Sequence, residues 1–262
     1  MYNLWAIGDI HGSYIPIENF YRRNNSHVKK FSQNKDVLIL LGDFGGNYYL
    51  DKRDNKFKEK LKNYGLTYFI IRGNHEERAS VCAFNNPDLW HTETFFDNIV
   101  YVENKFPYIK YALDEPALYQ VNDYKTLIIP GAYSVDKYYR LKKGWSWFSN
   151  EQLSPEEMDT GRRLVKENNT VDLVLSHTCP ISYEPKDLFL PSIDQSMVDK
   201  TMEMYLGEIE YKLKYTLWLW GHFHSYRIYY SNYKIRQIML DSQKVIKIDE
   251  CINNSSRIIK TY

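Results

Sequence analysis

The hydrophobic positions of this chain are concentrated in short continuous runs, and most of these runs end in glycine and a polar residue. Continuous apolar runs of this length are typical of strands buried on both faces, as in parallel sheets. Five such strands are predicted, at Leu4–Ile7, Asp36–Leu41, Thr67–Ile71, Val171–Leu175 and Thr216–Trp220.

Amphipathic segments between these runs predict helices. Proline in a first turn favours one helix, and Ser154 followed by proline and two glutamates indicates the start of another. The predicted helices span Ile15 to about Asn24, Asp54–Tyr64, Pro155 to about Glu167, and Gln195 to about Lys214. Alternation of strands and helices predicts an α/β fold with a parallel sheet and a site along one edge of it.

Shorter apolar or alternating runs predict an antiparallel part. They lie at Val100–Glu103, Tyr108–Leu113, Ala117–Val121, Thr126–Ile129, Tyr226–Tyr230, Ile235–Leu240 and Lys244–Ile248, before a polar tail from about residue 251. No repeat or linker interrupts the pattern, so residues 1–262 are expected to form a single domain.

Composition narrows the function classes. The net charge is +1, which gives no signature of a nucleic-acid partner, and no apolar run is long enough to span a membrane. The three cysteines lack the spacing of a disulfide framework or a thiolate zinc site. A cytoplasmic protein is therefore expected.

Side chains that can bind metals follow all five predicted buried strands. They are Asp9 and His11, Asp43, Asn74 and His75, His177, and His222 and His224. Only two of the seven histidines lie elsewhere: His27, expected in an exposed loop, and His91, expected either to be structural or to flank a substrate cleft. Each motif alone could be an ordinary turn or core histidine, but five coincidences of strand, glycine and ligand favour a site.

The ligand types indicate the chemistry. Oxygen and nitrogen ligands without thiolates favour Mn²⁺, Fe, Zn²⁺ or Ni²⁺ over Mg²⁺ or Ca²⁺, and Mn²⁺ is our first expectation. The candidates are too many for one ion, and a carboxylate can bridge two ions. Two ions about 3.5–4 Å apart clamp an in-line displacement at phosphorus.

The motifs GDIHG, GDFGG, GNHE, the lone His177 and GHFH resemble, in this order, the motif set of the calcineurin-like metallophosphoesterases. The resemblance extends from Gly8 to His224. It implies a four-layer α/β/β/α sandwich, in which helices flank two central mixed sheets and a dimetal site lies at the carboxyl ends of the strands.

The resemblance also implies a role for each motif residue. Asp9, His11 and His224 would hold the first metal, Asn74, His177 and His222 the second, and Asp43 would bridge the two. His75 would face the phosphate, where it stabilises the transition state or protonates the leaving oxygen. A hydroxide shared by two cations is a nucleophile at neutral pH and would attack phosphorus in line.

One departure from the family concerns the second motif. Where its protein Ser/Thr phosphatases carry an Asp-Arg pair, this chain has Gly46 and Asn47. Arg72, Arg78 or Arg140 could grip phosphate instead. The segment 131–140, with Tyr133 and Asp136, resembles one in a bacterial and phage subset of the family, and either lines the substrate side of the site or is a packed surface loop.

The leading hypothesis is a two-metal phosphoesterase that hydrolyses phosphomonoesters and some diesters. A protein Ser/Thr phosphatase is the first alternative, and a non-catalytic scaffold of the same fold is the second. The physiological substrate, the native metals and the oligomeric state do not follow from the sequence.

Overall fold

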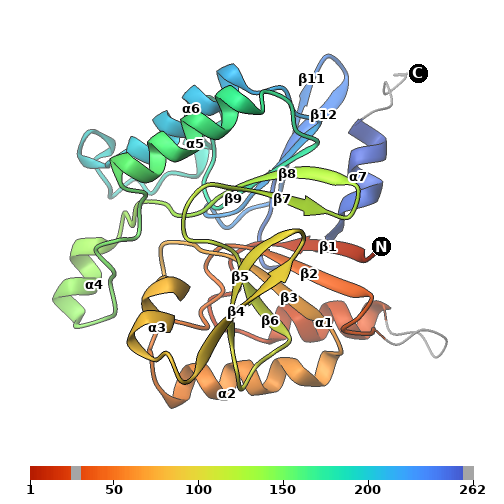
Figure 1. Ribbon diagram of the computed structural model, residues 1–262. Coiled ribbons are helices and arrows are strands. Elements are labelled where there is room, and N and C mark those ends of the chain that lie inside the picture. Colours follow the sequence, from red (N-terminus) through yellow and green to blue (C-terminus); the bar gives the residue numbers. More distant parts are fainter. Residues whose placement is uncertain (25–30, 256–262) are drawn as a thin grey trace.

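The computed structural model of the protein describes residues 1–24 and 31–255. Within them, two β-sheets stack face to face and helices cover both outer surfaces (Figure 1). The four-layer α/β/β/α sandwich implied by the motifs is therefore confirmed. His27 lies outside the described residues.

The first sheet has seven strands in the order β13-β1-β2-β3-β6-β5-β4. Strands β1, β2, β3 and β6 are parallel, and β13, β5 and β4 are antiparallel to their neighbours. The strands are β1 (Asn3–Ile7), β2 (Asp36–Leu41), β3 (Thr67–Ile71), β4 (Trp90–Phe95), β5 (Asn98–Glu103), β6 (Ile109–Tyr111) and β13 (Ile246–Lys247).

The second sheet has six strands in the order β11-β12-β10-β9-β8-β7. Its four central strands are parallel, and an antiparallel strand closes each edge. The strands are β7 (Ala117–Val121), β8 (Tyr124–Ile129), β9 (Leu173–Ser176), β10 (Leu217–Trp220), β11 (Arg227–Ser231) and β12 (Lys234–Met239).

Helices cover the outer face of each sheet. The first sheet carries α1 (Ile15–Asn24), α2 (Lys52–Leu61) and α3 (Ala79–Asn85), and the second carries α5 (Pro155–Glu167) and α6 (Thr201–Lys212). The short α4 (Lys137–Lys143) projects to one side, and α7 (Ile248–Ser255) packs beside β12 and β1 (Figure 1). None of the helices in the described residues is long and apolar enough to cross a membrane.

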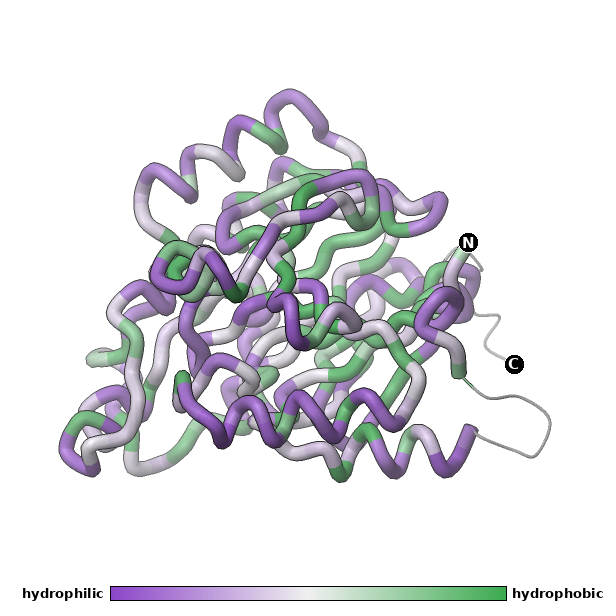
Figure 2. The backbone as a smooth tube through the Cα atoms, turned by 60° about the horizontal axis from the view of Figure 1, so that its bottom comes forward, coloured by the Kyte–Doolittle hydropathy of each residue, from purple (hydrophilic) through white to green (hydrophobic). Residues whose placement is uncertain are grey.

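Strand β2 shows why the buried runs are continuously hydrophobic. Leu38 and Leu40 face the helices of the first sheet, whereas Val37, Ile39 and Leu41 face the second sheet. Both faces of the strand are buried, so every position favours an apolar side chain. Figure 2 shows the hydrophobic strands in the interior and mostly hydrophilic helices around them.

The directions of the strands bring their carboxyl ends to one edge of the two sheets, where the site can form. Strands β1, β2 and β3 are parallel neighbours in one sheet, and β9 and β10 are parallel neighbours in the other. Their carboxyl ends meet, so that loops distant in sequence come together.

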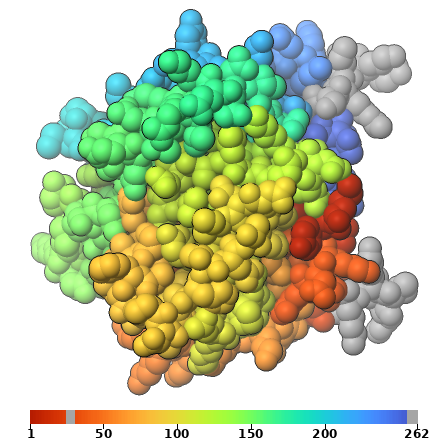
Figure 3. All heavy atoms as spheres, viewed as in Figure 1, coloured from red at the N-terminus to blue at the C-terminus, as the bar shows by residue number. Residues whose placement is uncertain are grey.

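On the side of the molecule shown in Figure 3, α3, β4 and β5 form much of the surface.

Several sequence predictions differ from the structure in the less regular parts. Helices α3 and α4 were not predicted, because both are short and neither has a side-chain N-cap hydrogen bond. Strand β4 was not predicted either. The predicted helix from Gln195 to Lys214 is too long, since α6 begins at Thr201. The side chain of Asp194 accepts from the N–H of Ser196, and that of Asp199 from the N–H of Thr201, which favours turns before the helix.

The C-terminal part also differs from the prediction. Strand β12 is antiparallel to β11, as predicted, but it is also parallel to β10, and β13 crosses to pair antiparallel with β1 of the first sheet. Residues 251–255, the described part of the expected polar tail, belong to α7, and Ile252 is buried in the core between the sheets.

Candidate metal centre

The loops after β1, β2, β3, β9 and β10 bring all the predicted metal ligands together. They form two groups of side chains, with Asp43 between them. The group nearer the solvent comprises Asp9, His11 and His224, and the deeper group comprises Asn74, His177 and His222.

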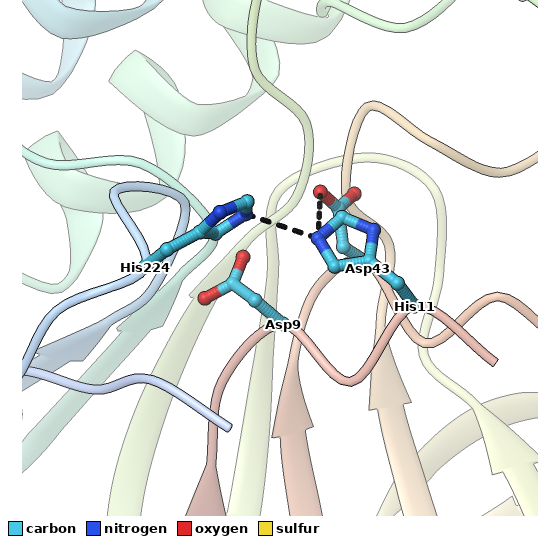
Figure 4. Close-up of side chains that lie close together, drawn as sticks. All are labelled: Asp9, His11, Asp43 and His224. Carbon is cyan, nitrogen blue, oxygen red and sulfur yellow. Dashed lines mark hydrogen bonds and ion pairs between the residues drawn. The ribbon is translucent and has the colours of Figure 1, made fainter. Parts of the chain in front are cut away.

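The outer group is compact. His11 Nε2 lies 3.0 Å from His224 Nε2 and 3.7 Å from Oδ2 of Asp43 (Figure 4). One ligand atom from each of Asp9, His11, Asp43 and His224 lies within 4.8 Å of the others, a spacing that one ion could bridge.

In the deeper group Asn74 and His177 are buried, and His222 is half-buried. His177 Nε2 lies 2.8 Å from Asn74 Oδ1 and 3.5 Å from Asp43 Oδ1, and the rings of His177 and His222 are 4.9 Å apart. The two oxygens of Asp43 therefore face different groups, Oδ2 the outer and Oδ1 the deeper.

Hydrogen bonds orient the deeper ligands. His177 Nδ1 lies 2.7 Å from the carbonyl oxygen of Leu41, a partner to which it can only donate. Asn74 Nδ2 donates to Ser134 Oγ over 2.8 Å, so the amide oxygen faces His177. Two acceptors thus meet at 2.8 Å, and they need a shared proton or cation between them. This donor set fits a metal ion.

The ionisation states support the same conclusion. Burial raises the pKa of Asp9 well above its ordinary value. Burial also acts to raise the pKa of Asp43, but His177, His75 and other neighbours outweigh it and lower this pKa well below the ordinary value. Burial opposes the charged form of His177, but Asp43 reverses the effect and raises this pKa to about 9. Asp43 thus stabilises positive charge on its neighbour His177, as it would stabilise a bound cation.

The motif glycines make room for ligands from other motifs. A Cβ atom on Gly42 would lie 2.0 Å from Nδ1 of His177, and one on Gly73 would lie 2.2 Å from Oδ1 of Asp43. A Cβ on Gly221 would lie 2.6 Å from Oδ2 of Asp9. Any larger residue would displace a ligand, which explains the glycine before Asp43, Asn74 and His222.

His75 lies at the edge of the site. Its backbone N–H donates to Asp43 Oδ1 over 2.9 Å, and its ring is next to that of His11, with centroids 5.1 Å apart. Burial lowers its pKa to about 4, so the ring is neutral at pH 7 in this environment. Its Nε2 lies 3.9 Å from Oδ1 of Asp136. The catalytic role of His75 stays a prediction.

The three arginines predicted to bind phosphate have other partners. Arg72 is buried, pairs with Asp114 at 3.2 Å and donates to backbone carbonyl oxygens. Arg78 pairs with Glu157, and the buried Arg140 donates to Ser134 Oγ over 3.3 Å. These contacts favour a structural role for all three arginines, and substrate binding by them stays a prediction without support from the geometry.

Tyr133 and Asp136 flank buried Ser134 at the start of the segment 131–140, and both are half-buried. Asp136 reaches the site through its approach to His75. Whether these two residues bind substrate stays a prediction.

Three buried residues around the ligands were not predicted. Glu76 accepts hydrogen bonds from the N–H groups of Gly73, Gly45 and Phe44, and so ties the second motif to the third. Its place as the last residue of GNHE was a usable signal. Ser134 and Glu151 support Asn74, and nothing in the sequence around Glu151 indicates this.

Comparison with known families decides the classification. The family model described as calcineurin-like phosphoesterase matches residues 2–226. The chain belongs to this family. Its members typically bind two divalent metals, and the cluster around Asp43 is a candidate site for them.

Solved structures resemble this family member in fold. The protein TT1561 of Thermus thermophilus superposes with a TM-score of 0.53 at 11% identity, over 96% of each chain. A phosphopantetheinyl hydrolase from Mycobacterium tuberculosis gives a TM-score of 0.44 at 13% identity, over 91% of this chain and 88% of its own. At such identities the likeness to TT1561 supports the fold alone. No curated protein sequence matches the chain.

Proposed function

We propose that this protein is a two-metal phosphoesterase that hydrolyses phosphomonoesters, and some phosphodiesters, by in-line attack of water on phosphorus. Asp9, His11 and His224 would hold one divalent cation, and Asn74, His177 and His222 the other. Mn²⁺ is the cation that we propose first, with Fe, Zn²⁺ or Ni²⁺ as alternatives.

One observation supports this proposal above the others. The two carboxylate oxygens of Asp43 face separate groups of ligand atoms, with Oδ2 3.7 Å from His11 Nε2 and Oδ1 3.5 Å from His177 Nε2. A single structural ion would not require a ligand set on each side of one carboxylate. Two bound cations would lower the pKa of a water molecule and neutralise charge on the phosphoryl oxygens.

The protein's own groups would complete the chemistry. His75, neutral and at the edge of the site, can donate a hydrogen bond to a phosphoryl oxygen or to the leaving oxygen. Oδ1 of Asp136 lies 3.9 Å from His75 Nε2, too far for a hydrogen bond, so the single N–H of the neutral ring stays available to the substrate. No protein nucleophile is required, since water is the attacking group.

Several observations favour a small phosphoester over a phosphoprotein. Asn47 is buried, and its side-chain oxygen accepts from Lys58 over 3.1 Å, so it faces the protein interior. Gly46 offers no side chain. The two positions that hold the phosphate-binding pair in the protein phosphatases therefore offer no phosphate-binding side chain in this protein.

A panel of substrates in Mn²⁺ tests the proposal. Purified protein would be assayed with 4-nitrophenyl phosphate, its diester, nucleotides, cyclic nucleotides and a phosphoprotein, and its metal content measured in parallel. We expect turnover of monoesters that is lost on chelation and restored by Mn²⁺. Efficient action on the phosphoprotein alone would favour the protein phosphatase, and two bound ions without any hydrolysis would favour the scaffold.

A further inference from the structure

Two buried polar residues outside the ligand motifs form a chain of hydrogen bonds that ends on Asn74. Asn74 Nδ2 donates to Ser134 Oγ over 2.8 Å, and Ser134 Oγ donates to Oε2 of Glu151 over 2.5 Å. The backbone N–H of Ser134 donates to the other carboxylate oxygen over 3.0 Å. Asn74, Ser134 and Glu151 are 2%, 1% and 3% exposed, so water does not compete for these bonds.

The direction of these bonds determines the orientation of the Asn74 amide. A serine hydroxyl has one hydrogen, and the carboxylate of Glu151 commits that hydrogen because it can only accept. Ser134 Oγ is then an acceptor toward Asn74, and only the NH₂ end of the amide satisfies it. The amide oxygen is left facing His177 Nε2 at 2.8 Å, where the second cation would lie.

Glu151 is itself held on several sides. The indole N–H of Trp147 donates to its Oε2 over 2.9 Å, and Arg72 donates to its backbone carbonyl oxygen over 2.7 Å. Arg72 directly follows β3 and precedes the loop that carries Asn74. Hydrogen bonds to side-chain and backbone atoms therefore hold the segment 131–151 against the loop that carries Asn74.

We propose that Ser134 and Glu151 are positioning residues for the second cation, acting through the amide of Asn74. The inference rests on the proposed two-metal function. Residues that hydrogen-bond to metal ligands commonly contribute about ten- to a hundredfold to metal affinity. We expect a contribution of this order from Ser134 and Glu151.

The test is a Mn²⁺ titration of the full chain with Ser134→Ala and Glu151→Gln. Bound Mn²⁺ per chain would be measured at buffered free Mn²⁺, and electron paramagnetic resonance would separate spin-coupled pairs from single ions. We expect the second Mn²⁺ to bind roughly tenfold or more weakly in both variants, with the first unchanged. Turnover at saturating Mn²⁺ should recover most of the wild-type value, because both residues are buried and neither is a proposed metal ligand.

Ser80→Ala is the matched control. Ser80 Oγ donates to Asp114 Oδ2 over 2.7 Å, so this variant also removes a hydroxyl-to-carboxylate bond, at a residue outside the ligand groups. It should bind both ions as the wild type does. Circular dichroism would check folding, and if Ser134→Ala does not fold, Glu151→Gln, which changes the side-chain volume little, decides the test.

Wild-type affinity for both ions in Ser134→Ala and Glu151→Gln would overturn the proposal, as would an equal loss of both ions. A wild-type chain that binds only one Mn²⁺ would overturn it too. Failure of the proposed function looks different: the wild type would bind two Mn²⁺, the variants would lose the second, and no phosphoester would be hydrolysed.

Discussion

Five of the proposed ligands have a backbone conformation that side chains rarely adopt. The φ angles are positive at Asp9 (42°), His11 (45°), Asp43 (47°), His222 (71°) and His224 (51°). Asp and His tolerate this region better than most residues, but each such position still costs about 1–3 kcal/mol. The surrounding structure maintains these conformations, which is typical of residues held in place for function.

His75→Asn should reduce turnover by about 10²–10³-fold, the usual cost of removing a hydrogen-bond donor that faces the transition state. Metal content should stay at the wild-type value, because only the backbone N–H of His75 contacts Asp43. Steady-state rates on an aryl phosphate and elemental analysis would measure the two effects. His91→Asn is the control, since His91 lies on β4 and contacts Asn104. Loss of metal from His75→Asn would show that its role is misassigned.

Asp43→Asn should weaken the binding of both ions together, by about tenfold or more each. Asparagine suits the same positive φ, so the change removes the charge and one acceptor without disturbing the backbone. Isothermal titration with Mn²⁺ would measure both affinities. Selective loss of one ion would exclude a bridging role for Asp43.

At the scale of elements, α6 contains a buried acid that makes stability depend on pH. Glu203 accepts from Thr178 Oγ1 over 2.6 Å, yet burial raises its pKa to about 7. Between the unfolded value of 4.5 and about 7, the folded state binds more protons than the unfolded state. The free energy of unfolding therefore falls as the pH rises through this window, by about 3 kcal/mol in total.

Glu203→Gln should remove this dependence, because the amide stays neutral and can still accept from Thr178. The free energy of unfolding of the variant, minus that of the wild type, should be larger at pH 8 than at pH 5, by up to about 3 kcal/mol. Urea unfolding at the two pH values would measure it, with the exposed Glu167→Gln as control. An identical pH profile in Glu203→Gln and wild type would contradict this account.

The same scale shows what could be predicted from the sequence. Strand β2 was predicted with the bounds that it has, since burial on both faces leaves a continuous apolar run. Strand β4 was missed because half of its residues are exposed and the strand carries no such signal. The start of α6 was misplaced because local aspartate turns compete with the helix, which depends on side-chain geometry.

The set of ligands could be predicted because each one lies in a loop that follows a strand, and the resemblance of the motifs to the family implied its division into two groups. The second layer around them could not. Ser134 and Glu151 are 17 positions apart and act through contacts that form only when the segment folds back on the β3 loop. Neither a strand pattern nor a motif spacing indicates such a contact.

At the scale of the whole molecule, the candidate centre joins the two sheets. Its ligands come from loops of both sheets, so bound ions would link the two halves and stabilise the folded state over the unfolded one. Mn²⁺ at a hundred times its Kd should add about 2.7 kcal/mol per ion to the free energy of unfolding. A rise in melting temperature with Mn²⁺, and its reversal by chelator, would measure this.

Asp43→Asn serves as the control for the thermal experiment. It should gain far less from the same Mn²⁺ concentration, because both ions are weakened. An equal rise in both proteins would mean that Mn²⁺ stabilises the chain somewhere other than the candidate centre.

The two ligand groups also differ in their access to solvent, since the side chain of His11 is 35% exposed and that of His177 is 0% exposed. We expect ions on the two sides to exchange with the medium at different rates, which exchange of radioactive Mn²⁺ would reveal as two phases. The deeper ion would then be a resident part of the protein. The outer ion would be replaceable, so the metal found there after purification would reflect the growth medium more than the protein's own preference.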